Sequence, residues 1–445
     1  MLKKEDNEKV TRSGPGTPLG NLLRSYWQPV ALVSEMSDER PVKAVRIMSE
    51  DLVLFRRSNG WGLVSRYCPH RGVDLSFGRL EGDGIRCLYH GWLFDAEGRC
   101  VEQPAEPPHS QFRHKVRIAN YPCIEKNGII FTYMGAGDPP PLPNWDCFVA
   151  PEEYTFAFKG LWECNWLQGL EGGIDPSHVS FLHRFLKEDP REKYGQQFAE
   201  EVAGTGKTLS TLVGEFYRPD IEVEEAEHGL RVYALRQLAE DVKHVRITNL
   251  LFPNAFVVPF GNTKVFTQWH VPVDDEHHYW YMIWYDFAEP TDRETLLRQR
   301  LEGVTLPDYR PIRNRSNNWG FDPREQKELT YTGMGLDINV HDQWAVESMG
   351  PIQDRTVERL GTSDRAITAN RRLLLRAIDA FAAGARIPAH PVSESEAAAL
   401  TGPAAVDLIA EAGDWQTEWR EREAERRAAS PWAGPLMRSG ETVDA

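Results

Sequence analysis

The chain has 445 residues and a formal net charge of −15. This length is enough for two or three domains with cores of their own, and the acidic balance argues against a nucleic-acid partner or an anionic membrane surface. No apolar run reaches the length of a membrane span, and residues 1–6 lack the apolar start of a secretion signal.

The N-terminal part of the chain predicts a small all-β domain. Residues 51–56 and 62–67 are short apolar runs on either side of Asn59-Gly60, a dipeptide typical of tight hairpin turns. Residues 128–133 predict a further strand. The proline-rich residues 139–143 that follow are typical of a stiff, extended boundary between domains.

Two cysteine–histidine pairs lie within this β domain, in Cys68-Pro69-His70 and in Cys87-Leu88-Tyr89-His90. Two thiolates and two imidazoles from two loops are the ligand set of a Rieske [2Fe-2S] cluster. A structural zinc site accepts the same four ligands, although one residue between Cys and His is an unusual spacing for zinc. We interpret the four residues as cluster ligands, and the other four cysteines as free thiols of a reducing cytoplasm.

A second group of candidate ligands contains His178 and His183, with Asp175 before them. Two histidines and a carboxylate form the facial triad that holds non-haem Fe(II) and leaves coordination positions open. Because residues five apart do not share a face of an ideal α-helix, we expect a distorted turn or a π-bulge between the histidines. We also expect Gly172-Gly173 to break the preceding helix. The downstream candidates for the carboxylate are Asp337, Asp342, Glu347 and Asp354.

Beyond the proline run, the pattern predicts helices mixed with long antiparallel strands. Residues 256–260 and 265–271 flank Gly261-Asn262 and predict a hairpin, and the apolar residues 279–287 predict a central strand covered on both faces. Residues 364–383 predict a helix that ends before Gly384. The densely charged residues 415–428 predict a solvated or subunit-contacting helix without chemistry.

Together these motifs resemble the Rieske non-haem iron oxygenases, and the flanking segments are most similar to the phthalate dioxygenase group. The similar segments are 14–20, 171–183 and 347–364. The resemblance implies an α+β chain in three parts. They are an N-terminal segment, 1–27, that packs on the catalytic domain, an all-β Rieske domain, 28–142, and a catalytic domain, 143–445, with an antiparallel sheet flanked by helices.

The resemblance also implies roles for three acidic residues. Alignment with the acidic ligand segment of the family makes Asp342 the third iron ligand, with Glu347 in reserve. The alternative for Asp342 is a helix N-cap. Asp175 would link His90 of one chain to His178 of the next, whereas its alternative is an N-cap before a proline. The link implies a head-to-tail ring, as a homotrimer or a dimer of trimers.

The implied activity is that of a terminal oxygenase that uses O2 and electrons from NADH. The electrons would come from a separate reductase with FMN and a [2Fe-2S] domain, because this sequence has no flavin or nicotinamide fingerprint. Arg236 and Arg246 lie among apolar strand residues and, with Ser180, predict capture of an aromatic carboxylate, although ordinary edge or surface arginines fit equally well. We expect ring cis-dihydroxylation, with O-demethylation of a methoxylated aromatic acid as the alternative, and a Rieske electron carrier as the alternative outside the class.

Overall fold

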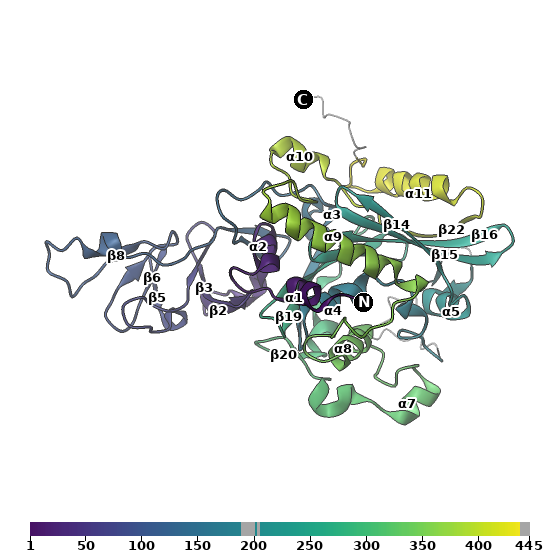
Figure 1. Cartoon of the computed structure of the whole chain (residues 1–445), viewed down its shortest axis with the longest axis horizontal. Helices are drawn as coiled ribbons and strands as arrows, with labels where there is room; N and C mark the ends of the chain where they lie inside the picture. The colour runs from purple at the N-terminus through teal and green to yellow at the C-terminus, as the bar shows by residue number, and fades with distance from the viewer. Residues whose placement is uncertain (188–200, 203–204, 437–445) are drawn as a thin grey trace.

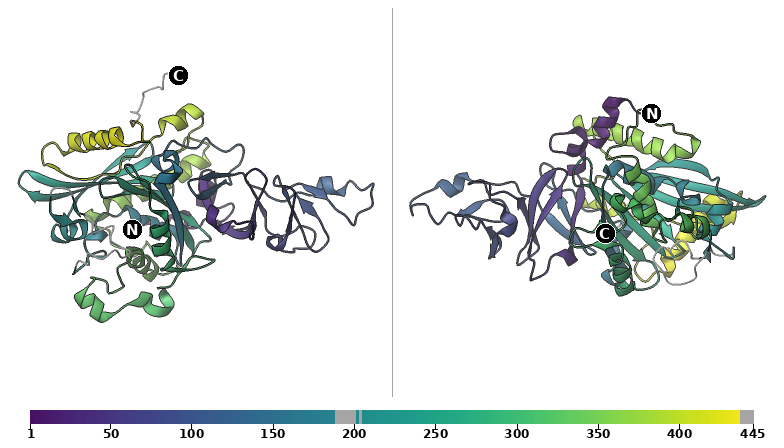
Figure 2. Two further views of the ribbon diagram at one scale, coloured as in Figure 1. Left: turned by 180° about the vertical axis from the view of Figure 1, so that it is seen from behind. Right: turned by 90° about the horizontal axis from the view of Figure 1, so that it is seen from below.

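The computed structural model describes residues 1–187, 201–202 and 205–436, and these form two bodies (Figure 1). A smaller body, built mainly from strands, projects from a larger body that contains both helices and strands, and the two views in Figure 2 show the same separation. The large sheet of the second body is antiparallel, with helices on both sides. This is the predicted α+β architecture.

Three small antiparallel sheets make up the smaller body. Their strands are β1 (Trp27–Leu32), β2 (Val42–Ile47), β3 (Glu50–Arg56), β4 (Trp61–Ser65), β5 (Arg79–Glu81), β6 (Gly84–Arg86), β7 (Leu93–Phe94), β8 (Cys100–Glu102), β9 (Cys123–Lys126) and β10 (Ile129–Tyr133). The predicted hairpin is confirmed, since β3 pairs with β4 and places Arg56 opposite Trp61. Gly60 in the turn has a φ of +90°, which favours glycine.

The smaller body is divided between two cores. Strands β3, β4, β6 and β7 enclose a separate core that includes Phe55, Val64 and Phe94. Strands β1 and β10 contribute instead to the main core, where the ring of Phe131 packs edge-on against that of Trp269 at 5.5 Å between centroids. The end of the smaller body that carries the Cys–His loops is therefore built separately, while its base is fixed to the larger body.

The N-terminal helices α1 (Lys4–Thr11) and α2 (Pro18–Arg24) contact the larger body. Val10 and Leu22 are fully buried in the main core. The Nδ2 group of Asn7 donates to the carbonyl of Gln353 (3.1 Å), and the Gly20 N–H donates to Oγ1 of Thr17, which caps α2 (3.1 Å). The bond between Asn7 and Gln353 ties the start of the chain to a residue 346 positions later.

The larger body is organised by an eight-stranded antiparallel sheet in the order β11-β19-β18-β17-β16-β15-β14, with β22 paired to β16. The strands are β11 (Thr155–Trp162), β14 (Asp220–Ala226), β15 (Gly229–Ala239), β16 (Val242–Leu251), β17 (Ala255–Phe260), β18 (Lys264–Pro272), β19 (His278–Asp286) and β22 (Asp407–Glu411). Two predictions are confirmed here, because β17 and β18 form the expected hairpin and the apolar β19 lies between β11 and β18. Four further strands form two short pairs, β12 (Glu201–Val202) with β13 (Lys207–Thr208) and β20 (Val304–Thr305) with β21 (Arg310–Pro311).

Helices cover both faces of the sheet (Figures 1 and 2). They are α3 (Asp146–Val149), α4 (Trp166–Ile174), α5 (Leu209–Glu215), α6 (Arg293–Leu301), α7 (Pro323–Glu328), α8 (Ile338–Ser348), α9 (Arg365–Ala382), α10 (Glu394–Ala399) and α11 (Trp415–Ala429). The predicted helix over 364–383 is confirmed as α9, and Gly384 after it has a φ of +68°. None of the helices in the described part of the chain combines the length and apolar character of a membrane span.

The prediction of a solvated or subunit-contacting α11 was wrong for one face of the helix, which packs against the rest of this chain. Trp415 and Trp419 are buried against Tyr233, with 5.3 Å between the ring centroids of Trp415 and Tyr233. Arg427 reaches across to the buried Asp146. The many charged residues made the amphipathic pattern of α11 hard to recognise, because the stems of long basic side chains can pack along apolar surface while their charged ends are paired.

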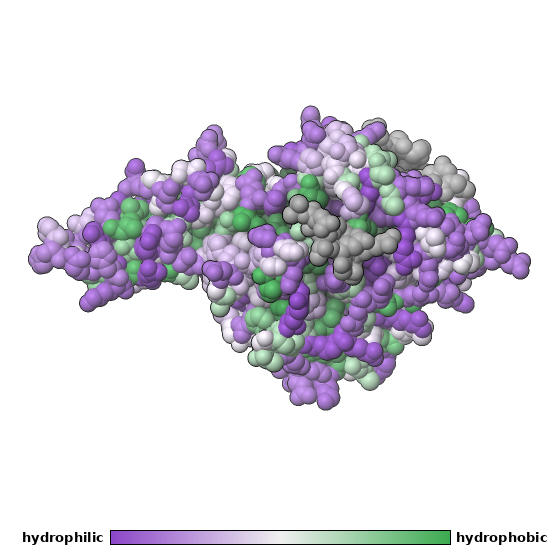
Figure 3. Space-filling view, turned by 90° about the horizontal axis from the view of Figure 1, so that it is seen from above, coloured by the Kyte–Doolittle hydropathy of each residue, from purple (hydrophilic) through white to green (hydrophobic). Residues whose placement is uncertain are grey.

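On the face of the molecule in Figure 3, the surface is mainly hydrophilic, with scattered hydrophobic patches.

Candidate metal centres and substrate cavity

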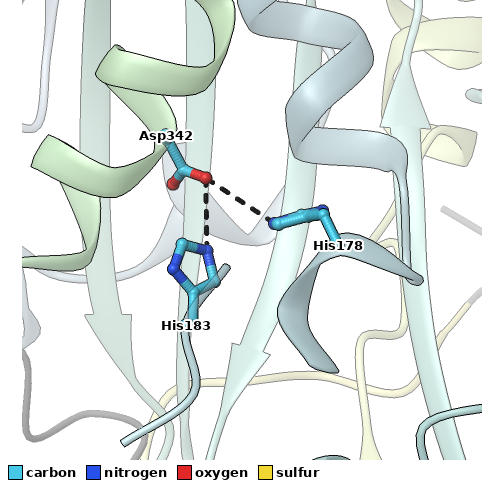
Figure 4. Close-up of side chains that lie close together, drawn as sticks. All are labelled: His178, His183 and Asp342. Atoms are coloured by element: carbon cyan, nitrogen blue, oxygen red, sulfur yellow. Dashed lines mark ion pairs between the residues drawn. The ribbon is translucent and has the colours of Figure 1, made fainter. Parts of the chain in front are cut away.

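The structure brings His178, His183 and Asp342 together, with one ligand atom of each within 4.8 Å of the others. Oδ1 of Asp342 lies 3.2 Å from Nε2 of His183 and 3.6 Å from Nε2 of His178 (Figure 4). The histidines come from the segment after α4, whereas Asp342 lies in the second turn of α8. Two imidazole nitrogens and one carboxylate oxygen are the donor set of a non-haem Fe(II) facial triad, so these residues fit that metal.

The backbone between the two histidines is irregular, as predicted, but it is a 3₁₀ turn rather than a π-bulge. His178 and Ser180 lie in this turn, residues 178–180, and the two imidazole rings meet at 82° with centroids 5.0 Å apart. The expectation that Gly172-Gly173 breaks the helix was wrong, since both lie inside α4. A Cβ on Gly173 would lie 2.0 Å from the Phe256 ring, so this glycine permits close packing of helix on sheet.

The carboxylate that the structure places beside the two histidines is that of Asp342 and not that of Glu347. Glu347 accepts hydrogen bonds from the Glu163 N–H (2.9 Å) and from Nε1 of Trp319 (2.8 Å), away from the histidines. The N-cap alternative for Asp342 is also wrong, because α8 begins earlier and Asp337 is its cap. Glu347 is therefore a buried structural carboxylate, and burial raises its pKa.

Asp175 lies beside His178, with Oδ2 of Asp175 3.8 Å from Nδ1 of His178. The alternative role of Asp175, the N-cap of a helix, is not what the structure shows: Asp175 is the residue after the end of α4, and its Oδ1 accepts from the Ser177 N–H (2.7 Å). Burial lowers the pKa of His178, but the carboxylates of Asp175 and Asp342 outweigh burial and raise it. Burial raises the pKa of Asp342, and the neighbouring His183 and His178 reverse this and lower it, so the carboxylate is charged.

His341 orients His183, and the sequence reading missed it. Nε2 of His341 donates to the Gly335 carbonyl (2.8 Å), which leaves its Nδ1 as an acceptor. Nδ1 of His183 lies 3.5 Å from that atom and can donate to it, so Nε2 of His183 keeps its lone pair for a metal. Burial lowers the pKa of His341 to about 4, which keeps its ring neutral at pH 7. The direct adjacency of His341 to Asp342 was the available signal in the sequence.

The predicted cluster residues converge in the smaller body. Cys68 and His70 follow β4, whereas Cys87 and His90 lie between β6 and β7. The two loops have the same form, because the N–H four residues after each cysteine donates to that cysteine's carbonyl, at 2.8 Å and 3.1 Å. The two residues that donate are Gly72 and Gly91, with φ values of +76° and +74°. Glycine adopts this conformation without strain, which explains why both loops have a glycine four residues after the cysteine.

The four side chains fit a [2Fe-2S] cluster. The rings of His70 and His90 have centroids 4.4 Å apart, and Trp92 stacks on His70 at 4.5 Å. Burial and the neighbouring Cys87 thiol raise the pKa of Cys68 to about 11. The neighbouring thiols of Cys68 and Cys87 are both buried, and cationic iron would stabilise their thiolates, which otherwise repel each other. Nδ1 of His90 is buried and has no hydrogen-bond partner among the described residues.

A cavity, partly open to solvent, adjoins the triad. Its apolar lining includes Phe256, Phe266 and Met282, and Gln268 and Arg246 line it with polar groups. An apolar wall with polar groups at defined positions is typical of a site for a small organic molecule. The sequence did not single out Gln268, since its place in the wall depends on the pairing of β17, β18 and β19.

Of the three residues predicted to bind substrate, the structure brings Arg246 to the cavity wall. Arg246 pairs with Asp407 and donates to the Pro259 carbonyl (2.9 Å). Arg236 and Ser180 are buried behind the wall, where Nη2 of Arg236 donates to the Pro176 carbonyl (3.1 Å). Neither arginine is the edge or surface residue of the alternative reading.

Comparisons with known proteins agree with this geometry. Residues 26–122 match the Rieske [2Fe-2S] domain, and residues 132–433 match the family described as LigXa C-terminal domain like. This chain belongs to the Rieske non-haem iron oxygenases. Membership makes the protein an oxidoreductase that incorporates O2, and gives it a Rieske cluster and a mononuclear iron. The zinc site and the electron carrier are thereby excluded.

Three relatives show the breadth of the family around this oxygenase. It is 36% identical to the phthalate 4,5-dioxygenase oxygenase subunit of Pseudomonas putida, over 86% of this chain and 88% of that protein. It is 31% identical to the 3-chlorobenzoate-3,4-dioxygenase oxygenase subunit of Comamonas testosteroni, over 95% of this chain and 99% of that protein. It is 33% identical to the 5,5'-dehydrodivanillate O-demethylase oxygenase subunit of a Sphingobium strain, over 86% of this chain and 82% of that protein.

Among solved structures, the oxygenase in the reduced oxygenase–ferredoxin complex of carbazole 1,9a-dioxygenase is similar to this chain. The TM-score is 0.55 at 21% identity, over 87% of this oxygenase and 99% of that chain. At that identity the likeness establishes the fold, and it confirms the two-domain α+β architecture. The relatives include dioxygenases and an O-demethylase, so the family alone leaves substrate and reaction open.

Proposed function

We propose that this oxygenase hydroxylates an aromatic carboxylate by ring cis-dihydroxylation, with NADH as the source of electrons. The observation that carries the proposal is a buried excess of positive charge at the cavity wall. Arg246 pairs with Asp407, and the charge of Asp407 also acts on the nearby Arg236, so these two guanidinium groups and one carboxylate leave one positive charge. A buried charge of this kind is stabilised when an anionic group of the substrate pairs with it.

The protonation states support this count. Burial and the nearby charge of Arg246 lower the pKa of Arg236 to about 10, so its guanidinium stays charged at neutral pH. Burial lowers the pKa of His244, which donates from Nε2 to Oδ1 of Asp407 (2.6 Å) and stays neutral. Nε and Nη1 of Arg236 and Oγ of Ser180 are buried without hydrogen-bond partners among the described residues. We propose that these donors help to hold the substrate carboxylate through intervening water.

The residues of the site then have distinct tasks. His178, His183 and Asp342 would hold a mononuclear iron, which would supply the reductive activation of O2. Phe256 and Phe266 in the cavity wall pack against the substrate ring and exclude water from it. The position of the ring relative to the triad decides which carbon is oxidised.

We propose that Asp175 links the two metal centres across a subunit boundary. Nδ1 of His178 lies 3.8 Å from Oδ2 of Asp175, and His90 has a second ring nitrogen besides the one that binds the cluster. A carboxylate that accepts from both rings would fix their tautomers and shorten the path for electrons. The proposed assembly is a head-to-tail homotrimer or a dimer of such trimers.

The proposed electron donor is a separate reductase with FMN and a [2Fe-2S] domain, and the proposed location is the cytoplasm. An exposed apolar rim around the cluster loops includes Tyr67, Leu88 and Tyr89, each about half exposed. Such a rim supports docking of another protein near the cluster. The four cysteines outside the cluster form no disulfide, which suits a reducing compartment.

Product analysis tests the proposal. The holoenzyme, paired with a phthalate-type reductase and NADH under air, is offered benzoates, phthalates and methoxybenzoates. A dihydrodiol without formaldehyde is the expected product. Formaldehyde with a phenol would instead establish O-demethylation, the activity in the name of the Sphingobium relative. Turnover of aromatic compounds without a carboxylate, at equal efficiency, would refute the role of the positive charge.

A further inference from the structure

A line of hydrogen-bonded groups runs from the cavity into the protein interior. Gln268 of β18 lies in the cavity wall, opposite Phe256 and Met282 of the neighbouring strands. Nε2 of Gln268 is 3.2 Å from Nε2 of His270, and Nδ1 of His270 is 2.9 Å from Nε2 of His278. The line ends where Nδ1 of His278 meets the Cys164 carbonyl at 2.8 Å.

The carbonyl at the end of the line sets the direction of every hydrogen bond in it. A carbonyl only accepts, so Nδ1 of His278 carries a proton and Nε2 of this neutral ring accepts. Nδ1 of His270 must then donate, which makes its Nε2 an acceptor. An acceptor at that position requires the NH2 group of Gln268 as its donor. The amide of Gln268 is thereby held in one of its two orientations.

Both histidines stay neutral, which this argument requires. Burial lowers the pKa of His278 to about 4 and places that of His270 well below its usual range. Helix α4 closes over the pair at Gly169, where an added Cβ would lie 2.4 Å from Nδ1 of His270 and 2.7 Å from Nε2 of His278. Water therefore has no room to replace the hydrogen bond between the rings.

We propose that Gln268 presents its carbonyl oxygen, Oε1, to the cavity as a fixed acceptor, and that the oxygenase thereby selects aromatic acids that carry a hydrogen-bond donor on the ring. The donor would be a hydroxyl or an amino group. Oε1 has no hydrogen-bond partner among the described residues, and Gln268 is 5% exposed. The assignment rests on the proposed function, to which it adds a feature of the substrate. Gln268 is a specificity-determining residue, and His270 and His278 are positioning residues.

Neutron diffraction from crystals of the holoenzyme tests the orientation without any substrate. The expected result is deuterium on Nδ1 of His270 and on Nδ1 of His278, none on Nε2 of either ring, and the Gln268 amide nitrogen directed at His270. Deuterium on Nε2 of His270 would overturn the proposal, because the Gln268 amide would then turn its NH2 group toward the cavity.

Ligand binding tests the consequence. Dissociation constants of 3- and 4-hydroxybenzoate are compared with those of 3- and 4-fluorobenzoate by calorimetry on the anaerobic holoenzyme, since fluorine is close in size to a hydroxyl but donates no hydrogen bond. At one ring position the wild type is expected to prefer the hydroxy acid by roughly 3- to 10-fold, the range for one neutral hydrogen bond. The ratio should fall to about one in Gln268→Leu.

Two further variants separate positioning from packing. His278→Phe removes the acceptor of His270, so the Gln268 amide is free to turn and the hydroxy-to-fluoro preference should fall. Phe266→Leu changes the same cavity wall without touching the line, and should alter both affinities by the same factor. Equal binding of both acids by the wild type would overturn the selection. If no benzoate bound at all while the neutron structure showed the expected protons, the aromatic-acid function would fail and the orientation would stand.

Discussion

Replacing Glu171 by glutamine should destabilise the region that carries the iron ligands. The Glu171 carboxylate is held by two buried arginines: Arg355 donates to Oε2 from Nε (3.2 Å) and Nη2 (3.0 Å), and Arg371 donates from Nε to Oε1 (2.5 Å) and from Nη2 to Oε2 (2.9 Å). Burial raises the pKa of Glu171, but the two arginines reverse this and lower it, so it is charged.

The size of the effect follows from what Glu171→Gln leaves behind. Arg355 is fully buried and depends on Glu171 for its charge balance, whereas Arg371 also pairs with Glu358. The amide removes the negative charge and turns one NH2 donor toward a guanidinium donor. Breaking a buried ion pair from one side costs about 3–5 kcal/mol of the free energy of unfolding. Since α4 leads directly into Asp175 and His178, a loss of bound iron is expected as well.

Urea unfolding of the holoenzyme, followed by circular dichroism, measures this cost. Glu358→Gln is the matched control, because it removes a partner of Arg371 at the edge of the same network and should cost less, about 1–3 kcal/mol. The double variant Glu171→Gln/Arg355→Gln restores the charge balance and should recover part of the loss. A cost below about 1 kcal/mol for Glu171→Gln, or a larger cost for Glu358→Gln, would refute the reasoning.

Three further predictions concern the metal centres and pH. His183→Ala should lose the mononuclear iron and keep the visible spectrum of the cluster, so that iron falls from about three to about two per chain; retention of all the iron would disprove the ligand assignment. Asp175→Asn should keep both metal centres while coupled turnover is nearly abolished, and normal turnover would exclude the proposed link. Burial lowers the pKa of His228 to about 3 and that of His278 to about 4, from the ordinary 6.5. Between these values the unfolded chain binds protons that the folded chain does not, so stability should fall as pH drops from about 6.5 to about 4, by up to about 1.4 kcal/mol per pH unit for each histidine. The His228→Asn variant should show a shallower decline in urea unfolding, and an unchanged slope would contradict this origin.

The sequence predicted best those features that short segments specify. The Cys–His loops repeat one turn whose glycine has a positive φ, so five neighbouring residues contain all the information needed. The hairpin around Gly261-Asn262 likewise depends on residues near the turn. The iron histidines were found because they lie five residues apart. Asp342 required comparison with a family, because nothing local distinguishes it from Glu347.

The features that the sequence did not reveal depend on contacts between distant segments. Asp407 reaches Arg246 because β22 pairs with β16, although about 160 residues separate them. Gly173 looked like a helix breaker, yet its lack of a side chain is required by the Phe256 ring on the sheet below. In each case contacts between segments far apart in the sequence override the local structural preference, and neighbouring residues alone do not reveal those contacts.

The same limit applies to histidine, of which the chain has thirteen. A sequence shows where an imidazole stands but not which nitrogen carries the proton, and that choice decides whether a ring binds metal or directs a neighbour. Here a backbone carbonyl makes the choice twice. Through His341, the Gly335 carbonyl leaves Nε2 of His183 bare for iron. Through two buried histidines, the Cys164 carbonyl turns the amide of Gln268. Backbone atoms that the sequence does not distinguish thus set the chemistry that faces both the metal and the substrate.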